Sequence, residues 1–308
     1  MLPAMASKKK LPDPPETPAP ETRPEVAVFE ATDTSRMAVP ADFAPTRSAP
    51  PPARRGMGYS PDVPDPRDWS TRAMLGAVRG LPTEASLERF VSRVQDQGST
   101  NSCVGQALAT AIEIRLRKMG YLTAPRPSAL GIYGYGRALS RRSPTDKLAD
   151  LGCFPRPAMT GLRDWGVPTE VAWPFDASKV NDELPWDVHQ QSSAFRVQAW
   201  YRIDALGRER VDAICSALSQ GYPVVFGVSI DEAFLSHTGK ALVGAPTGAI
   251  IGGHMMVLVG YSTTNAKRTL RGINSWGESW GDHGAFNASE SLVRHAGAGD
   301  FYVIQVGG

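Results

Sequence analysis

Three residues suited to nucleophilic catalysis lie far apart in this sequence: Cys103, His254 and Asn274. Cys103 begins an apolar-striped segment, which predicts an amphipathic helix over about residues 103–119. The polar residues 99–102 precede the cysteine and can cap this helix. A thiol at a helix N-terminus faces unpaired amide donors and the positive end of the dipole, so we expect its thiolate to be favoured. The alternative interpretation is a buried free cysteine without a catalytic role.

The histidine and the asparagine each adjoin a β-rich run. His254 precedes the apolar residues 255–259, and Asn274 follows residues 270–273. An asparagine carbonyl can hold one imidazole nitrogen so that the other nitrogen faces a thiol, and an indole such as that of Trp276 can shield this bond from water. The alternative is that the histidine is structural and the tryptophan fills the core.

The segments that must position these residues divide into a helical part and a β-rich part. Helical periodicity covers residues 103–119, 128–139, 158–165 and 208–221. Short β-rich runs cover residues 224–230, 255–259, 270–273 and 301–306. We therefore expect a mainly helical half followed by an antiparallel sheet or barrel.

The composition favours a globular protein and argues against binding to nucleic acid, to a membrane or to a metal ion. The chain has 308 residues and 42% hydrophobic content, which is enough for a globular core. A formal charge of +2 provides no broad field for nucleic acid or an anionic membrane, and no run approaches a membrane span or a standard signal peptide. Three cysteines and five histidines show no paired ligand spacing, so we expect no metal and no cofactor. So few cysteines favour a cytoplasmic or assembly-associated protein.

Residues 1–55 form a proline-rich tail. They carry 12 of the 26 prolines, and their only aromatic residues are Phe29 and Phe43. Such a segment buries too little apolar surface to repay the entropy of ordering, so we expect a disordered or extended tail. Its short apolar run at residues 26–29 is where a protein partner would dock. The composition changes after this tail, which predicts a folded domain over residues 56–308.

The order and context of these motifs resemble the papain-like cysteine proteases, in particular bacterial or phage-type members. The resemblance covers about residues 57–306. Three motifs carry it: Gln97-Gly98 followed by Ser102-Cys103, His254 with Val257, Val259, Gly260 and Tyr261, and Asn274-Ser275-Trp276-Gly277 with Trp280-Gly281 and Gly284. The proline-broken tail lies outside the resemblance and contains no long helical pro-segment of the kind that keeps many family members inactive.

The resemblance implies a two-lobed α+β fold with peptide bound between the lobes. The helical lobe, about residues 85–205, would bear Cys103, and the antiparallel β-barrel lobe, about residues 206–308, would bear the other two residues. Four roles are implied: Cys103 as a thiolate nucleophile paired with protonated His254, the Gln97 amide and the Cys103 N–H as oxyanion donors, Asn274 as the group that orients the imidazole, and Trp276 as a cover over the Asn–His contact.

The implied function is a thiol-dependent peptidase that hydrolyses peptide or protein substrates through an acyl-enzyme. A second hypothesis comes from a different class of protein. In it the chain is a structural or binding component of a larger assembly, such as a phage particle or secretion machinery, built on the same fold with the tail docking to a neighbour.

Overall fold

The structure is a computed structural model that describes residues 55–307 apart from 77–79, 144 and 193. All but the last residue of the predicted tail, including the predicted docking run at 26–29, lies outside the described residues. The described part of the chain belongs to one compact unit. None of its helices is long and apolar enough to cross a membrane.

The described residues form eight α-helices, four of which lie at the periodic segments that the sequence predicts. They are α1 (Thr71–Leu75), α2 (Cys103–Lys118), α3 (Ala129–Ser140), α4 (Pro155–Asp164), α5 (Trp186–Gln190), α6 (Gly207–Ser219), α7 (Glu232–Leu235) and α8 (Glu290–Arg294). Two 3-10 helices span Glu88–Phe90 and Ala177–Lys179. Helices α2, α3, α4 and α6 correspond to the four predicted ones.

The strands form a nine-stranded, mostly antiparallel sheet. They are β1 (Trp69–Ser70), β2 (Glu84–Ser86), β3 (Arg196–Arg202), β4 (Val224–Ile230), β5 (Leu242–Val243), β6 (Gly252–Thr264), β7 (Lys267–Ile273), β8 (Ala285–Ser289) and β9 (Ala298–Gly307). Their order is β1-β3-β9-β4-β6-β7-β8-β5, and β2 pairs with β6. Strand β3 lies in the predicted helical half, yet it pairs antiparallel with β9 and so belongs to the sheet.

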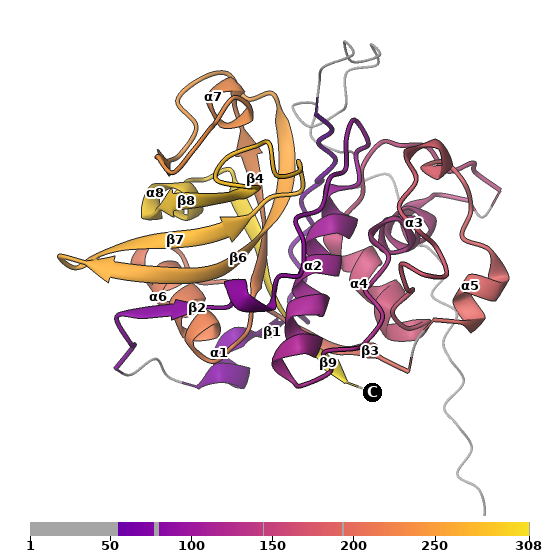
Figure 1. The fold of residues 1–308 in the computed structure, drawn as a ribbon, viewed down its shortest axis with the longest axis horizontal. Coiled ribbons are helices and arrows are strands. Elements are labelled where there is room, and N and C mark those ends of the chain that lie inside the picture. The colour runs from indigo at the N-terminus through magenta and orange to yellow at the C-terminus, as the bar shows by residue number, and fades with distance from the viewer. Residues whose placement is uncertain (1–54, 77–79, 144, 193, 308) are drawn as a thin grey trace, which may run out of the picture. The chain divides into compact units, whose positions relative to one another are not determined.

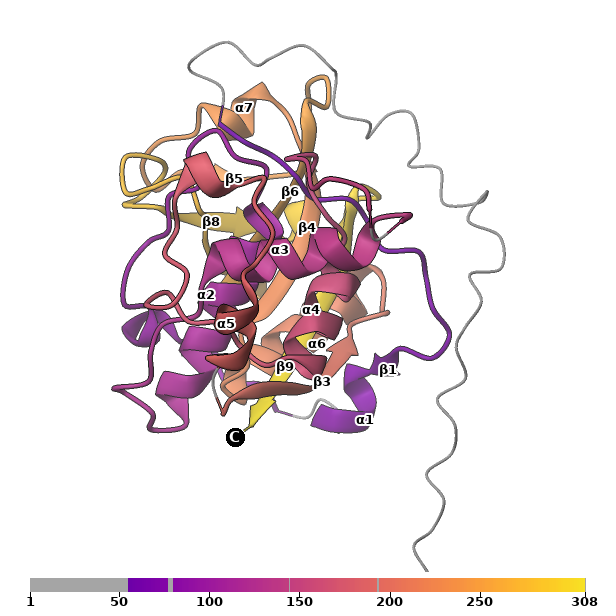
Figure 2. The same cartoon turned by 90° about the vertical axis from the view of Figure 1, so that its right-hand side faces the viewer.

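Helix α2 lies between the strands and the other helices of its half. Figure 1 shows α2 beside the sheet, and α3 packs on both α2 and α4 (Figure 2). Gly105 permits this packing, because a Cβ at that position would lie 2.2 Å from the Ala129 carbonyl oxygen. The predicted amphipathic helix is therefore buried on all faces from Cys103 to Leu116. Glu113 is buried with it and is partnered by Arg117 at 3.2 Å.

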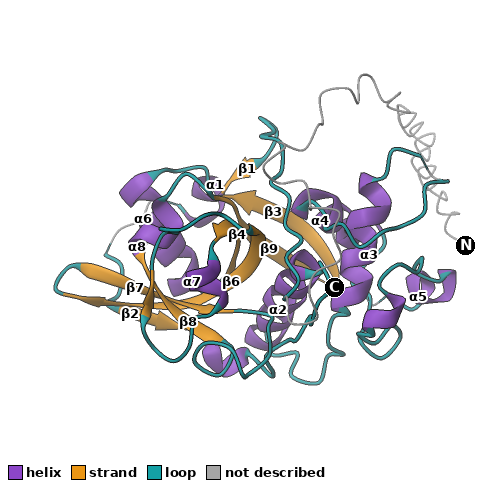
Figure 3. Ribbon diagram, turned by 90° about the horizontal axis from the view of Figure 1, so that it is seen from above, coloured by secondary structure: helices purple, strands orange, loops and turns teal. Residues whose placement is uncertain are grey.

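The sheet separates two groups of helices. Figure 3 shows α3, α4 and α5 on one side of the strands and α6 and α8 on the other. Strand β4 is buried at every residue, as expected for a central strand covered on both faces. Strand β6 pairs with β4 and β7, and its register places Val228 opposite His254 and Val257 opposite Ile273. The histidine and the asparagine after β7 are therefore fixed by two neighbouring strands.

Candidate active site

Cys103 is the first residue of α2 and is fully buried. The predicted side-chain cap does not form: the hydroxyl of the N-cap residue Ser102 lies 2.8 Å from that of Thr100 instead. The Cys103 Sγ accepts the Gly58 backbone N–H at 3.3 Å, and the nearby Met255 backbone also acts to lower the pKa of the thiol. Burial nevertheless raises the pKa of the Cys103 thiol to about 11, and these backbone hydrogen bonds offset only part of that rise. Burial of the sulfur thus acts against the expected thiolate, which stays a prediction.

His254 lies on β6 and makes the predicted contact with Asn274. Its Nε2 is 2.7 Å from the Asn274 Oδ1, and its ring stacks on that of Trp276 with centroids 4.4 Å apart. Because Oδ1 only accepts hydrogen bonds, Nε2 carries the proton and Nδ1 has a free lone pair. Among the described residues Nδ1 has no hydrogen-bond partner. Burial lowers the pKa of His254 to about 4, although the bond to Asn274 acts in the opposite direction.

Helix α2, which begins at Cys103, packs on β6, which carries His254. The backbone of Met255, the residue after His254, acts on the pKa of the Cys103 thiol. Asn274 follows β7, and its Oδ1 also accepts the Ser275 N–H at 2.7 Å. The structure therefore brings Cys103, His254, Asn274 and Trp276 to one place, from segments that lie far apart in the sequence.

Gln97 lies in the loop before α2 and contacts Ser275, the residue after Asn274. Its Oε1 accepts the Ser275 hydroxyl at 2.6 Å, and its backbone N–H bonds to the Ser275 carbonyl at 2.9 Å. Its Nε2 donates to the carbonyls of Gly56 at 3.0 Å and Thr100 at 2.8 Å. The Gln97 amide is thus fixed in position and is fully buried.

A segment that the sequence analysis did not assign to the site also contacts it. Residues 55–60, called the crossing segment below, run between the sheet and the helices (Figure 1). The Gly56 carbonyl accepts a hydrogen bond from the Gln97 side-chain amide, and the Gly58 N–H donates one to the Cys103 thiol. The alternation of glycines in Gly56-Met57-Gly58 is the one sequence signal that could have indicated this close approach.

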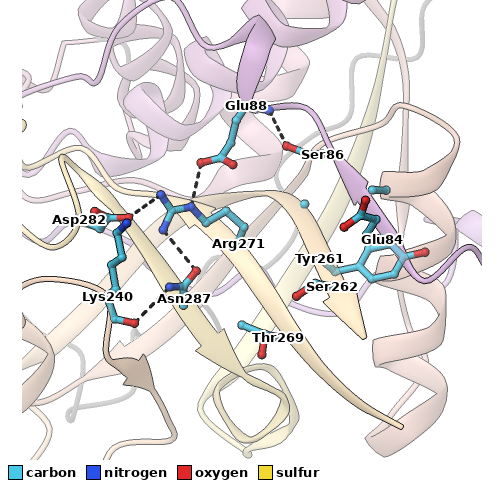
Figure 4. Close-up of a pocket in the computed structure, with 12 residues that line it drawn as sticks. Glu84, Ser86, Glu88, Lys240, Tyr261, Ser262, Thr269, Arg271, Asp282 and Asn287 are labelled. Atoms are coloured by element: carbon cyan, nitrogen blue, oxygen red, sulfur yellow. Dashed lines mark hydrogen bonds and ion pairs between the residues drawn. The ribbon is translucent and has the colours of Figure 1, made fainter. Parts of the chain in front are cut away.

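A polar pocket of about 580 Å³ lies elsewhere, against β2, β6, β7 and β8. Figure 4 shows Arg271 at its centre, bonded to Glu88 at 2.8 Å, Asp282 at 2.9 Å and Asn287 at 3.2 Å. None of the predicted site residues lines this pocket. The described part of the chain also holds no group of three or more His, Cys, Asp or Glu residues arranged to bind a metal ion.

Comparison with known proteins identifies the family. The model for papain family cysteine proteases matches residues 149–303, a range that includes His254 and Asn274 and begins after Cys103. A peptidase C1-like protein of Acanthamoeba polyphaga mimivirus is 30% identical over 276 residues, covering 82% of this chain and 87% of the relative. Peptidase 1 of Psoroptes ovis is 22% identical over 226 residues, covering 71% of this chain and 64% of its own length.

Solved structures share the fold. Xylellain, a cysteine protease from Xylella fastidiosa, superposes with a TM-score of 0.69 at 25% identity, over 84% of this chain and 98% of its own. Digestive procathepsin L 3 of Tenebrio molitor has a TM-score of 0.63 at 19% identity, over 82% of this chain and 76% of its own. The predicted two-lobed α+β fold is thereby confirmed, whereas membership of a bacterial or phage-type group stays a prediction. The chain belongs to the papain family of cysteine proteases and is a papain-like cysteine peptidase.

Proposed function

We propose that this peptidase acts through Cys103, His254 and Asn274, with Gln97 as an oxyanion donor and Trp276 as a shield. One observation carries the proposal. The imidazole is held through Nε2 by Asn274 at 2.7 Å, which leaves Nδ1 unbonded in the region where the Cys103 thiol packs on β6. The Nδ1 lone pair is therefore available to accept a proton.

The chemistry follows from these positions. Nδ1 of His254 takes the thiol proton, and the sulfur electron pair of Cys103 forms a bond to the substrate carbonyl carbon. The π electrons move to the carbonyl oxygen, which the Gln97 Nε2 and the Cys103 backbone N–H stabilise. The imidazolium then protonates the leaving amine as the C–N bond breaks. Water, deprotonated by the same imidazole, attacks the thioester and releases the acid with the thiol restored.

Asn274 and Trp276 act through the histidine. The Asn274 carbonyl fixes the tautomer with a proton on Nε2, which is the form that leaves Nδ1 basic. The indole of Trp276 is fully buried and stacks on the imidazole, so it keeps water from the Asn–His hydrogen bond. Both residues are positioning residues in this mechanism.

We further propose that residues 56–308 form the catalytic unit and that its substrates are peptides or proteins. No observation on the described residues favours the assembly-component alternative.

The test is the release of peptides from a proteome digest by the purified full chain under reducing conditions, read by mass spectrometry. Cys103→Ser is expected to abolish release. Cys215→Ser is the matched control, because Cys215 is also a buried free cysteine but lies on α6, and it should release the same peptides as the native chain. Equal release by Cys103→Ser and the native chain would refute the assignment of the nucleophile.

A further inference from the structure

A pocket of about 180 Å³ lies among α3, α4 and α5, which Figure 3 shows on the same side of the strands. Its walls include four rings: Tyr135 on α3, Trp165 at the end of α4, and Trp186 and His189 on α5. Trp186 and His189 are three residues apart and therefore share one face of that helix. None of the proposed catalytic residues lines this pocket, which is called the aromatic pocket below.

The rings of the aromatic pocket are held in place by contacts with one another. The centroid of the Trp165 ring lies 5.0 Å from that of Tyr135 and 5.4 Å from that of His189, and Trp186 lies 5.7 Å from His189. Tyr135 is buried and its hydroxyl is 3.1 Å from that of Ser192, whereas Trp186 is 71% exposed. The pocket therefore has a fixed base and is open to solvent beside Trp186.

Gly134 keeps the floor of the aromatic pocket open. It lies in the interior of α3, where glycine weakens a helix relative to alanine. Packing requires two other glycines of this helix: a Cβ at Gly131 would lie 2.9 Å from Pro168, and one at Gly136 would lie 2.7 Å from the Cys153 Sγ. A Cβ at Gly134 would meet nothing within 4 Å beyond its chain neighbours and the backbone of its own helix. Packing within the described chain thus does not explain Gly134, whereas an open pocket floor does.

The charges around the aromatic pocket favour a cation. Glu183 and Arg141 line it as an ion pair, so their charges cancel. Asp182 and Asp187 add two negative charges in an exposed segment, residues 182–187, that contains no Lys or Arg. Burial lowers the pKa of His189, so its imidazole adds no positive charge near pH 7.

The faces of the aromatic rings are available to a cation. No Lys or Arg of the described residues lies over the ring of Tyr135, Trp165 or Trp186, although other rings of the described chain have such a partner. Arg196 acts on Tyr135, but its guanidinium donates to two carbonyls near the end of α4 at 3.2 and 2.6 Å. Aromatic faces attract a positive group, and the attraction is stronger where the rings are shielded from water.

The size and the polar groups of the aromatic pocket select a methylated ammonium group. A cavity of about 150 Å³ holds one benzene molecule, so this pocket holds a group of that size and not a whole drug-sized ligand. Among the described residues that line the pocket, Glu183 carries the one carboxylate, and it is already paired with Arg141. The N–H groups of a primary ammonium would have to compete with that guanidinium, whereas a quaternary ammonium has no N–H to satisfy.

We propose that the aromatic pocket is a binding site for a methylated ammonium group, carried either by a small molecule such as choline or by a methylated lysine side chain of a peptide. This site is independent of the proposed catalytic roles, because it shares no residue with them.

The first experiment is isothermal titration calorimetry on the native full chain. Choline should bind at least tenfold more tightly than its neutral isostere, in which a tert-butyl group replaces the trimethylammonium group. A second pair of probes, a peptide with trimethyllysine and the same peptide with unmodified lysine, identifies the carrier by comparison with choline. Equal affinity of choline and its isostere, or no binding of either methylated probe, would overturn the proposal.

The second experiment repeats the titration on three variants. Trp186→Ala removes a wall of the pocket and should weaken binding at least tenfold. Trp69→Ala is the matched control and should bind like the native chain, because Trp69 is likewise exposed, at 61%, but contacts Tyr201. Gly134→Ala adds a methyl group to the pocket floor, so binding should weaken while the melting temperature stays the same or rises. Native affinity in both Trp186→Ala and Gly134→Ala would show that the probes bind elsewhere and would sink the proposal.

Two further outcomes have distinct meanings. Binding of a proline-rich peptide that Trp186→Ala abolishes, without binding of either methylated probe, would assign the pocket to a polyproline segment and overturn the proposal. Cys103→Ser should bind choline like the native chain, so failure of the proposed catalytic roles would leave this site intact.

Discussion

The pH dependence of Cys103 alkylation is the most direct measure of the pKa of this buried thiol. With a pKa of about 11, the Cys103 thiol is ionised to about one part in 10⁴ at pH 7. A thiol with an unshifted pKa of 9.0 is ionised to about one part in 10². The less acidic thiolate is intrinsically more nucleophilic, by nearly tenfold for this difference in pKa. A Cβ at Gly58 would lie 1.9 Å from the Asn101 carbonyl oxygen, so Gly58→Ala should move the Gly58 N–H away from the thiol and admit water. We therefore expect Gly58→Ala to raise the alkylation rate of Cys103 at pH 7 about tenfold through ionisation alone.

The assay is iodoacetamide labelling from pH 5 to pH 10, with the site of labelling read by mass spectrometry. The native chain should show a rate for Cys103 that rises tenfold per pH unit without a plateau near neutrality. Gly58→Ala should react faster and level off at a lower pH. Cys215 is an internal control, because burial raises its pKa to about 12 and its environment on α6 does not involve the crossing segment. A plateau near neutral pH in the native chain, at the Gly58→Ala rate, would show that a thiolate–imidazolium pair already exists beneath the segment and would refute this reasoning.

Three further predictions concern the proposed catalytic residues Gln97 and Asn274 and the buried carboxyl group of Asp62. In the native full chain, Gln97→Ala should lower kcat by roughly ten- to a thousandfold with KM nearly constant in steady-state kinetics, because it removes a donor to the oxyanion; unchanged kcat would contradict that role. In the same full chain, Asn274→Ala should slow both turnover and Cys103 alkylation near neutral pH, because the imidazole loses its 2.7 Å partner; a native alkylation profile would argue against it. Burial raises the pKa of Asp62 to about 7, so the folded state keeps a proton that the unfolded state releases above about pH 4. The free energy of unfolding, measured in urea, should therefore fall as the pH rises from 4 to 7. Asp62→Asn should reduce this dependence on pH.

The motifs of the site could be predicted because their immediate neighbours determine where they lie. The apolar run after His254 specifies a buried strand, and the β-rich run before Asn274 specifies the adjacent strand of the same sheet. Two neighbouring strands that each carry one of these residues bring them together, which is why the Asn–His contact followed from sequence order. The periodic pattern after Cys103 likewise predicted α2 to within a residue of its observed end.

The ionisation of the thiol could not be predicted from local sequence. A helix N-terminus favours a thiolate by roughly 1 kcal/mol when it is exposed to solvent. Burying the charge costs several times more, and that cost depends on how completely residues from distant segments cover the sulfur. Gly58 and Met255 are among those residues, and neither is near Cys103 in the sequence. Desolvation is therefore the largest influence on the pKa of the Cys103 thiol.

The contacts of the crossing segment could not be predicted from sequence either, since its turn-forming residues are typical of a domain boundary. Its contacts with Gln97 and Cys103 span 41 and 45 residues, and its contact with Trp276 spans 220. Contacts over such separations depend on the whole fold, because the segment, the loop before α2 and the loop after β7 must first be brought together. Burial of the thiol is therefore a property of the assembled fold, whereas the identity of the nucleophile can be predicted from its local motif.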